Sequence, residues 1–444
     1  MTVQEKTESR SRPQTRTRRA GPGKAKISIN GYFKDLGGWF SLLRKRAAWI
    51  NTGNPHWALD TTDPIADLAA HLHPGLLRTR IAELRQETPS TRTFRLVLAP
   101  EEAEAGRRLP AFHAGQYLSV KFLIEGRATS RPFAISSGPA EALGEKVGLG
   151  GMSPAEEAGF VEITLKRKPG GYVSEYVWEH WEKGSELLLD APFGTTYYNG
   201  IRDAAHVIGL AGGSGVTIFR SIIKDMLQRG QRPERLTLLF GSRCAADILY
   251  RAELDRLAAA SKGRVRIVHV LSEPEEGWQG ETGFLSAELI ARLVPDYAEA
   301  SFYVSGPAAL YDYIVPELDR LAIPPTRRRL EAYGESSCIE QHPGFPGMPG
   351  MTYKLAVRFG RDEQLVAARS TETVAVALER AGLAADTRCR SGECGWCRSL
   401  LEDGEVWQRP ESDGVRARDR DVGYFHPCSA YPLGNLAVRV FTRL

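Results

Sequence analysis

Three cysteines share one short loop near the end of the chain, and a fourth follows later. Cys389, Cys394 and Cys397 form a C-x4-C-x2-C pattern, and Cys428 is the distant fourth member. Three thiolates from one loop and one from elsewhere are the ligands of a [2Fe–2S] cluster, which carries one electron at a time. A structural zinc site is the alternative, but such sites usually show two short C-x2-C pairs. The sequence therefore predicts a [2Fe–2S] cluster held by these four cysteines.

A glycine-rich turn lies where nucleotide-binding sheets hold a pyrophosphate. The stretch Gly212-Gly213-Ser214-Gly215-Val216-Thr217 follows a buried strand expected at 205–210 and precedes a helix expected at 218–228. Glycines let the backbone approach a phosphate, and a helix N-terminus complements its charge. Strands and helices alternate in this way over 201–335, which predicts an α/β doubly wound nucleotide domain. A tight packing turn is the alternative to phosphate binding.

These two patterns carry a resemblance to a known family. Residues 353–444, with their four cysteines, resemble a plant-type ferredoxin domain, and the part before them resembles the ferredoxin–NADP reductase superfamily of flavoproteins. The glycine turn is similar to that family's G-G-x-G-x-[TP]. Over 77–444 the chain resembles single-chain reductases that supply electrons to oxygenases and desaturases. The resemblance implies three cofactors: FAD, with FMN as the alternative; the [2Fe–2S] cluster; and NADPH, with NADH as the alternative.

Two further stretches match the family's flavin motifs. Residues 131–137, Arg-Pro-Phe-Ala-Ile-Ser-Ser, resemble R-x-[YF]-[ST]-x-x-S, which implies that Arg131 binds a flavin phosphate and that Phe133 lies beside the isoalloxazine ring. Residues 168–174 resemble the G-x-x-S segment, whose backbone N–H groups hold the pyrophosphate. The flavin-binding residues implied are Arg131, Phe133, Ala134, Ile135, Ser136, Gly171, Val173 and Ser174.

The chain departs from the family at two of these positions. Members commonly carry Ser or Thr where this chain has Ala134, and Tyr where it has Phe133. Alanine has no hydroxyl to bond the flavin N5, so the backbone is expected to serve instead. We therefore expect a modest flavin affinity.

The resemblance extends to the nicotinamide and ribose positions. Residues 303–307 resemble Y-x-C-G-P, with Ser305 in place of Cys, and residues 330–334 resemble the final strand near the flavin edge. Ser242 and Arg243 follow the second strand and suit a 2′-phosphate, although Arg243 also fits NADH-using relatives. The nucleotide-binding residues implied are Gly212, Gly213, Ser214, Gly215, Thr217, Ser242, Arg243, Tyr250 (stacked on adenine), Gly306 and Pro307. The catalytic residues implied are Phe133, Ser305, Glu331 and Tyr333.

Composition describes an ordinary multidomain globular protein. Of 444 residues, 42% are hydrophobic and 25% charged, and a net charge of +4 gives no reason to expect a nucleic-acid partner. Four of six cysteines belong to the cluster pattern, which argues against a disulfide-built secreted protein. No apolar run is long enough for a transmembrane helix, and no signal-peptide core is evident. We therefore expect a cytoplasmic protein.

Short alternating strands and turns predict the elements that carry these residues. The flavin domain, 77–200, should be an antiparallel β-barrel, with a surface insertion at 138–159. An irregular linker over 336–352 leads to an α+β β-grasp ferredoxin domain at 353–444. Strands are expected at 77–84, 91–98, 117–123, 161–166, 236–240, 265–271, 302–305, 353–359 and 363–367, and helices at 252–260, 308–321 and 373–381.

The N-terminal part lies outside the resemblance. Residues 1–27 read as a disordered basic tail, and 28–76 as a helical extension. Apolar residues of 36–50 recur at helical spacing, with Arg44, Lys45 and Arg46 largely opposite them. We expect this helix to dock on its own protein; peripheral membrane contact through 28–50 is the alternative, which would make the protein membrane-associated.

The modules form one electron path, from NAD(P)H through flavin and [2Fe–2S] cluster to a partner oxygenase, desaturase or demethylase. Two other functions stay open: a reductase for another acceptor, such as an iron–sulfur or haem enzyme or a quinone, and a non-catalytic electron carrier or redox sensor. Ala134 and Ser305 are the features that favour the last. Arg388, Arg390 and Arg398 flank the cluster loop and suit an acidic docking partner, with free solvated charge as the alternative.

Overall fold

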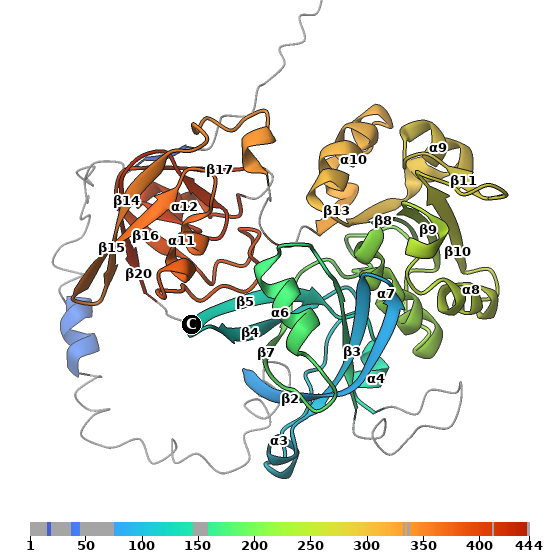
Figure 1. Ribbon diagram of the computed structural model, residues 1–444, viewed down its shortest axis with the longest axis horizontal. Coiled ribbons are helices and arrows are strands. Elements are labelled where there is room, and N and C mark those ends of the chain that lie inside the picture. The colour runs from blue at the N-terminus through green and yellow to red at the C-terminus, as the bar shows by residue number, and fades with distance from the viewer. Residues whose placement is uncertain are drawn as a thin grey trace, which may run out of the picture.

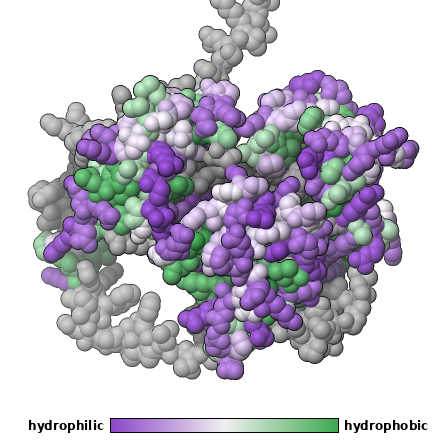
Figure 2. All heavy atoms as spheres, viewed as in Figure 1, coloured by the Kyte–Doolittle hydropathy of each residue, from purple (hydrophilic) through white to green (hydrophobic). Residues whose placement is uncertain are grey.

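The computed structural model describes residues 16–18, 37–44, 75–144, 159–331, 334, 338–410 and 413–441. These residues form three lobes (Figure 1), with the barrel at lower centre, the nucleotide domain at right and the ferredoxin domain at left. On the face in Figure 2, hydrophobic side chains gather on the ferredoxin lobe, while hydrophilic ones predominate at the right.

The flavin domain is an antiparallel barrel of six strands in the order β5-β4-β7-β2-β3-β6. Alternate residues point inward and build a core in which Phe94, Leu118 and Ile163 are fully buried. A bridge between Ile135 and Ile163 joins the end of β5 to β6. The elements are β2 (Leu76–Thr88), β3 (Thr91–Leu98), α3 (Pro100–Glu104), β4 (Tyr117–Ile124), β5 (Arg127–Ala134), α4 (Pro139–Ala142), β6 (Val161–Lys166), α6 (Tyr172–His180) and β7 (Glu186–Phe193).

Strand β5 escaped the sequence analysis because half of its residues are polar and it contains Pro132. Proline has no backbone N–H to donate to a neighbouring strand, so it is tolerated in an edge strand. Strand β5 stands first in the strand order and forms its ladder with β4. The predicted insertion loop at 138–159 begins with helix α4; residues 145–158 of it lie outside the described residues.

The nucleotide domain is a parallel sheet of six strands in the order β11-β10-β9-β8-β12-β13. The chain runs outward from β8 to β11 and then returns to the other side of β8 with β12, so the topological switch point lies between β8 and β12. The elements are β8 (His206–Gly212), α7 (Val216–Gln228), β9 (Arg235–Ser242), α8 (Arg251–Ala260), β10 (Val265–Leu271), β11 (Glu281–Thr282), α9 (Ala287–Leu293), β12 (Ser301–Ser305), α10 (Ala308–Arg320) and β13 (Arg328–Glu331).

The ferredoxin domain is a β-grasp sheet in the order β15-β14-β20-β16-β18 covered by helix α11. The Thr373 hydroxyl caps α11 by accepting a hydrogen bond from the Val376 amide. The elements are β14 (Thr352–Phe359), β15 (Asp362–Arg369), α11 (Val374–Arg380), β16 (Ser399–Asp403), β17 (Glu405–Gln408), α12 (Ala417–Asp421), β18 (Tyr424–Phe425), β19 (Ala430–Pro432) and β20 (Leu436–Val440).

Two segments expected to be irregular contribute to the ferredoxin domain. Strand β1 (Arg16–Arg18), in the predicted disordered tail, pairs antiparallel with β17 through backbone hydrogen bonds. In the predicted linker, Ile339 is buried against Trp407 and Tyr431, with Phe345 packed beside them. Apolar residues among the linker's prolines thus anchor it to the domain that follows.

Residues 37–44 of the N-terminal extension are helical. Trp39, Phe40 and Leu43 of the predicted apolar stripe are 56%, 51% and 39% exposed, so this described part of the stripe is not packed against the rest of the described chain and does not support the expected docking. The other residues of that apolar stripe lie outside the described part. No helix among the described residues is long and apolar enough to cross a membrane.

Candidate functional site

A cavity of about 460 Å³ lies between the barrel and the nucleotide domain. It is formed by the end of β5, the start of α6, and the turns after β8 and β12, which meet at the switch point of the parallel sheet. Most residues expected to hold the flavin and the nicotinamide line this one cavity: Arg131, Phe133, Ala134, Gly171, Val173, Ser174, Ser214, Gly215, Thr217, Ser305, Gly306 and Pro307. Residues more than 170 positions apart in sequence are thereby brought together.

Glycine is required where the two turns of the nucleotide domain meet. A Cβ on Gly215 would collide with the carbonyl of Ser305, so only glycine allows this close approach. Gly213 has a φ of +52°, in the left-handed region that favours glycine. The glycines thus allow the turn after β8, predicted to bind a phosphate, to pack closely against Ser305 of the predicted nicotinamide segment.

The start of helix α6 faces the same cavity. Its N-cap residue, Gly171, makes no side-chain cap, so N–H groups of the first turn are available to an anion. The Ser174 hydroxyl donates to the Lys168 carbonyl at 3.1 Å and holds the preceding turn closed. This arrangement suits a pyrophosphate.

Arg131 lies at the end of the cavity nearest the ferredoxin domain. Its Nη1 donates to Thr129 Oγ1 at 2.6 Å and to the Ser130 carbonyl at 2.7 Å, and it lies 3.9 Å from Glu379 of the ferredoxin domain. About a quarter of its side chain is exposed, at 24%, so its charge can reach an anion in the cavity. The contact with Glu379 was not foreseen from the sequence.

Ile135 and Ser136 do not line the cavity. Ile135 is fully buried at its bridge to Ile163, and the Ser136 hydroxyl donates to the Glu162 carbonyl at 3.1 Å. The Ser136 carbonyl accepts from Arg220 at 2.9 Å, so this pair joins the barrel to the nucleotide domain. Their expected part in flavin binding therefore does not fit their positions.

A larger cavity of about 1020 Å³ adjoins the first at the carboxyl ends of the parallel strands. Gly212, Gly213, Ser242 and Arg243 line it, as expected for a nucleotide site. Arg243 is 65% exposed at the side chain and lies 3.2 Å from Asp247. Among the lining residues that sequence analysis missed are Lys166, Phe284 and Tyr313, because no motif marks them. Phe284 and Tyr313 form an aromatic pair with ring centres 5.7 Å apart.

Tyr250 lies outside both cavities and is 6% exposed. Its hydroxyl hydrogen-bonds Thr93 at 3.0 Å and also Thr164, and the Arg220 guanidinium lies 4.6 Å from its ring centre. The expectation that Tyr250 stacks on adenine is therefore wrong for this structure, because its ring is enclosed between the barrel and the nucleotide domain.

Three further residues were predicted to be catalytic: Ser305, Glu331 and Tyr333. Glu331 pairs in register with Ser305 across the parallel ladder, which brings its backbone beside the flavin cavity. Ser305 itself is 2% exposed. Tyr333 lies outside the described residues.

The four predicted cluster ligands converge in the ferredoxin domain. Cys389, Cys397 and Cys428 are buried, and Cys394 is exposed. Amides of Ser391 and Cys394 both point at Cys389 Sγ, at 3.4 Å. Interaction with the Cys394 and Cys428 thiols lowers the pKa of the Cys389 thiol. Four thiols with backbone N–H groups aimed at sulfur suit a [2Fe–2S] cluster.

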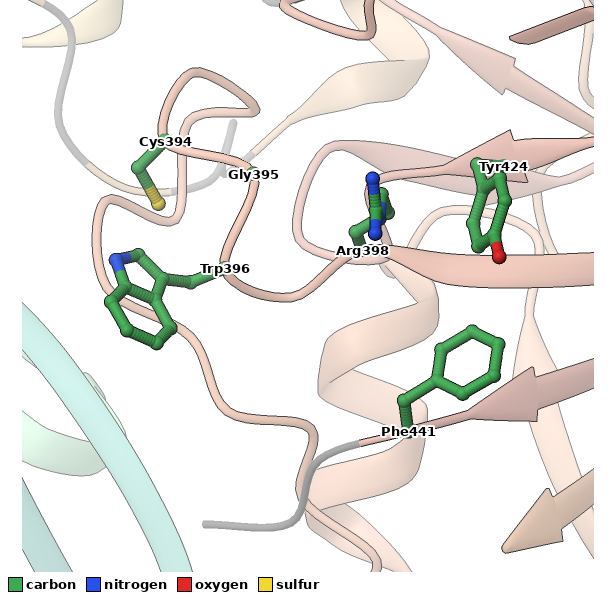
Figure 3. Close-up of a pocket in the computed structure, with 6 residues that line it drawn as sticks. All are labelled: Cys394, Gly395, Trp396, Arg398, Tyr424 and Phe441. Atoms are coloured by element: carbon green, nitrogen blue, oxygen red, sulfur yellow. The ribbon is translucent and has the colours of Figure 1, made fainter. Parts of the chain in front are cut away.

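Figure 3 shows the open side of the cluster loop. A hollow of about 340 Å³ is lined there by Cys394, Gly395, Trp396, Arg398, Tyr424 and Phe441. Trp396 is 48% exposed and also makes an edge contact with Phe193 of the barrel, at 6.4 Å between ring centres. The loop thus has one side against the barrel and one toward solvent.

The three arginines that flank the loop have different partners. Arg388 pairs with Asp190 of the barrel at 2.7 Å, and Arg390 is fully buried against Glu379. Only Arg398 faces the open hollow, where it lies 3.3 Å from Asp419. All three predicted basic residues therefore pair with an acidic residue of this chain, and Arg398 is the one that also lines the open hollow.

Comparison with known proteins agrees with these sites. The oxidoreductase NAD-binding domain model matches residues 210–315, and the 2Fe-2S iron-sulfur cluster binding domain model matches 358–433. The glycine betaine monooxygenase reductase subunit of Pseudomonas aeruginosa is 25% identical over 372 residues, which cover 81% of this chain and 94% of that protein. An NADPH oxidoreductase of Mycobacterium tuberculosis is 28% identical over 379 residues, covering 83% and 85%.

Two further matches also cover at least four-fifths of this chain. The ferredoxin reductase component of 3-ketosteroid-9-alpha-monooxygenase from Mycobacterium tuberculosis is 25% identical over 366 residues, covering 80% of this chain and 93% of that protein. The solved structure of phthalate dioxygenase reductase, 19% identical, covers 86% of this chain and all of its own at a TM-score of 0.55, which shows the shared three-domain fold. This chain is an NAD(P)H-dependent oxidoreductase in which an oxidoreductase NAD-binding domain is followed by a 2Fe-2S iron-sulfur cluster binding domain, and over about four-fifths of its length it is similar to reductase components of monooxygenases.

Proposed function

We propose that this reductase passes electrons from NAD(P)H through FAD and the [2Fe–2S] cluster to a partner oxygenase. The observation that carries the proposal is the position of β5. The end of this strand lines the flavin cavity with Arg131, Phe133 and Ala134, while Thr129 and Ser130 on the same strand bond the ferredoxin domain. One strand therefore links the flavin site to the domain that holds the cluster.

The oxygenase as partner rests on the relatives. Two of them, at 25% identity, are named as reductase components of monooxygenases. A desaturase or demethylase partner stays an alternative of the same class. The cavities and the complete cysteine set favour this function over a non-catalytic carrier or sensor.

We assign the chain's residues the following roles. A bound flavin takes up two electrons from the nucleotide and releases them singly, which is the chemistry that the cofactor supplies. Arg131 binds the flavin phosphate, and the α6 N-terminus binds the pyrophosphate. The turn at Gly212–Gly215 binds the phosphates of NAD(P)H. Ser305 and Gly306 orient the nicotinamide toward the side of the cavity that Phe133 lines, and the paired domains exclude water.

Removal of a cluster ligand tests the path. We expect the visible spectrum of Cys394→Ser to lose its iron–sulfur bands while NADPH or NADH still bleaches the flavin without oxygen. Cys338→Ser is the matched control, because Cys338 is exposed and outside the ligand set. In that control both sets of bands should bleach. Flavin bands that stay unbleached in the intact protein would refute the proposed path at its first step.

The choice of nucleotide is tested at Arg243. We expect Arg243→Ala to weaken NADPH by about tenfold and NADH little, because a charged hydrogen bond to the 2′-phosphate is lost. Apparent KM values for both nucleotides measure this, and Arg256→Ala, an exposed arginine on α8, is the control. Equal losses for the two nucleotides would remove the 2′-phosphate assignment.

A peripheral membrane contact through residues 28–50 is a second proposal. The exposed Trp39, Phe40 and Leu42 on helix 37–44 support it, since aromatic side chains favour the membrane interface. Co-sedimentation with anionic vesicles tests it, and equal sedimentation of Trp39→Ser and the unaltered protein would contradict it.

A further inference from the structure

Three consecutive residues lead into the cluster loop, and each of them contacts a different strand of the barrel. Asp386, Thr387 and Arg388, which we call the anchor segment, stand directly before Cys389, the first predicted cluster ligand. In that order they contact β4, β5 and β7. These three strands are neighbours in the barrel, in the order β5-β4-β7. The backbone that carries the ligand is therefore held at three points on one sheet.

The contacts at the two ends of the anchor segment are ion pairs. Asp386 accepts from Lys121 Nζ at 2.7 Å, and Arg388 Nη2 lies 2.7 Å from a carboxylate oxygen of Asp190. Arg388 also pairs with Asp386 two residues before it, so the four charges alternate in sign along one chain of contacts. The four side chains are between 7% and 15% exposed. Removal of one charge would leave its buried partner without full compensation, which is costly.

The contact in the middle of the segment is neutral and completely buried. The Ser130 hydroxyl donates to the Thr387 carbonyl at 2.7 Å, and both residues are 0% exposed. Beside this contact, the guanidinium carbon of Arg388 lies 4.8 Å from the ring centre of Trp396 in the cluster loop and 5.9 Å from that of Phe193 on β7. The loop and the barrel thus share one arginine that makes ionic and aromatic contacts together.

The signs of the charges favour one docked orientation. Asp190 on β7 is opposite Ser119 on the paired strand β4. Because alternate residues of a strand share a face, Lys121 points to the same side of the sheet as Ser119 and Asp190. The barrel therefore presents one negative and one positive charge to the positive and negative charges of the anchor segment. A reversed orientation would bring like charges together, which is unfavourable.

We propose that the anchor segment, with Asp190 and Lys121, holds the first cluster ligand in a fixed position relative to the flavin cavity and thereby sets the rate of electron transfer from flavin to cluster. The inference rests on the proposed electron path. Strand β5, which the segment contacts at Ser130, lines the flavin cavity with its last residues. The step moves one electron from flavin to cluster, and no bond forms or breaks. The charged residues are positioning residues, because a fixed geometry between two centres speeds the step between them.

The test measures the two steps of reduction separately in the full chain with both cofactors bound. After rapid anaerobic mixing with NADPH or NADH, bleaching of the flavin absorbance reports the first step. Growth of the reduced cluster's electron paramagnetic resonance signal in freeze-quenched samples reports the second. Asp190, Lys121 and the anchor segment do not line the flavin or nucleotide cavity, so the first step should keep its rate. We expect Arg388→Met and Asp190→Asn to slow the second step by about tenfold or more.

Further variants grade this effect. Lys121→Met should slow the second step less, since the pair of Arg388 with Asp190 remains. The double variant Arg388→Met/Asp190→Asn should stay within about twofold of Arg388→Met, because both changes remove one interaction. Arg388→Lys should recover part of the rate through the same pair. Arg358→Met is the matched control: it removes a ferredoxin-domain arginine whose partner Glu363 lies in that domain, and both of its steps should keep their rates.

The midpoint potential of the cluster distinguishes positioning from damage to the cluster. We expect this potential and the iron content to be unchanged in each variant. Slower transfer together with a shifted potential would overturn the positioning role, because the driving force would explain the rate. Asp190→Asn and Lys121→Met lie in the barrel and leave the cluster loop intact, so they decide the question if Arg388→Met loses its cluster. An unchanged second step in Asp190→Asn also overturns the inference.

Failure of the proposed function would look different. If neither nucleotide bleaches the flavin of the unaltered protein, or if its cluster then stays oxidised, the electron path itself is wrong. If the unaltered protein completes both steps and Asp190→Asn completes them at the same rates, the path stands and only the role of the anchor segment is removed.

Discussion

At the nucleotide-domain face of the barrel, Arg220 reaches across to Glu162, and both side chains are almost fully buried, at 3% and 0% exposed. At the ferredoxin face the corresponding buried pair, Arg390 and Glu379, lies within one domain and contacts the barrel at Thr129, Ser130 and Arg131. The first interface is thus joined by several cations that share one buried carboxylate, and the second by hydrogen bonds and by two separate ion pairs, Lys121 with Asp386 and Arg388 with Asp190.

The difference between the two interfaces is consistent with the reaction geometry that each must maintain. Glu162 also pairs with Arg85 and Arg95, so three arginines from two domains surround one carboxylate. Hydride transfer requires the reacting atoms to lie within about 3.5 Å, which demands a fixed angle between flavin and nucleotide domains. A single electron needs no bond between donor and acceptor, so the ferredoxin contact can be weaker.

The largest effect is expected at the first interface. Arg220→Met leaves Glu162 buried without its closest cross-domain partner, and we expect the free energy of unfolding to fall by about 3–5 kcal/mol. Urea unfolding followed by tryptophan fluorescence measures this. Arg358→Met, which removes an exposed pair with Glu363, is the control and should cost under about 1 kcal/mol. Similar losses in the two variants would erase the contrast between buried and exposed pairs.

The same interface should respond to acid. Burial alone would raise the pKa of the Glu162 carboxyl, but the charges of Arg220, Lys224 and Arg85 hold it well below its ordinary 4.5. A carboxyl whose pKa is lowered by folding stabilises the protein above the unfolded pKa, and that stability is lost as pH falls below 4.5. We expect the unaltered protein to lose about 1.4 kcal/mol per pH unit more than Glu162→Gln between pH 4 and about 3. Parallel stability curves for the two proteins would contradict this.

A smaller effect is expected at the ferredoxin face. Lys121 and Asp386 are 11% and 15% exposed, so Lys121→Met should cost roughly 1 kcal/mol, mainly in docking. Its signature is faster proteolysis between residues 331 and 352 with an unchanged unfolding midpoint for the flavin and nucleotide domains. If Lys121→Met destabilised the flavin and nucleotide domains as much as Arg220→Met does, the proposed difference between the two interfaces would be wrong.

Much of the fold and of the candidate site follows from local patterns. Strands at 91–98 and 161–166 have the predicted bounds, because β-branched and apolar residues recur there with turn residues at each end. Strand β5 was missed because its outward residues are polar, and they are polar because they meet another domain rather than solvent. Tyr250 was misplaced because a tyrosine after a strand looks the same whether it faces a nucleotide or a neighbouring domain.

The sequence by itself determined the expected chemistry: the cysteine spacing predicts a cluster, and the glycine turn with its following helix predicts a phosphate site, since both depend on residues that are close along the chain. Only the tertiary structure decided which partners Glu379 and Arg390 contact. Glu379 meets Thr129 across 250 positions of sequence, and Arg390 meets Ser130 across 260. No local pattern distinguishes a solvated arginine from one buried beside a distant carboxylate, because the cost of burial is set by partners that folding alone brings together.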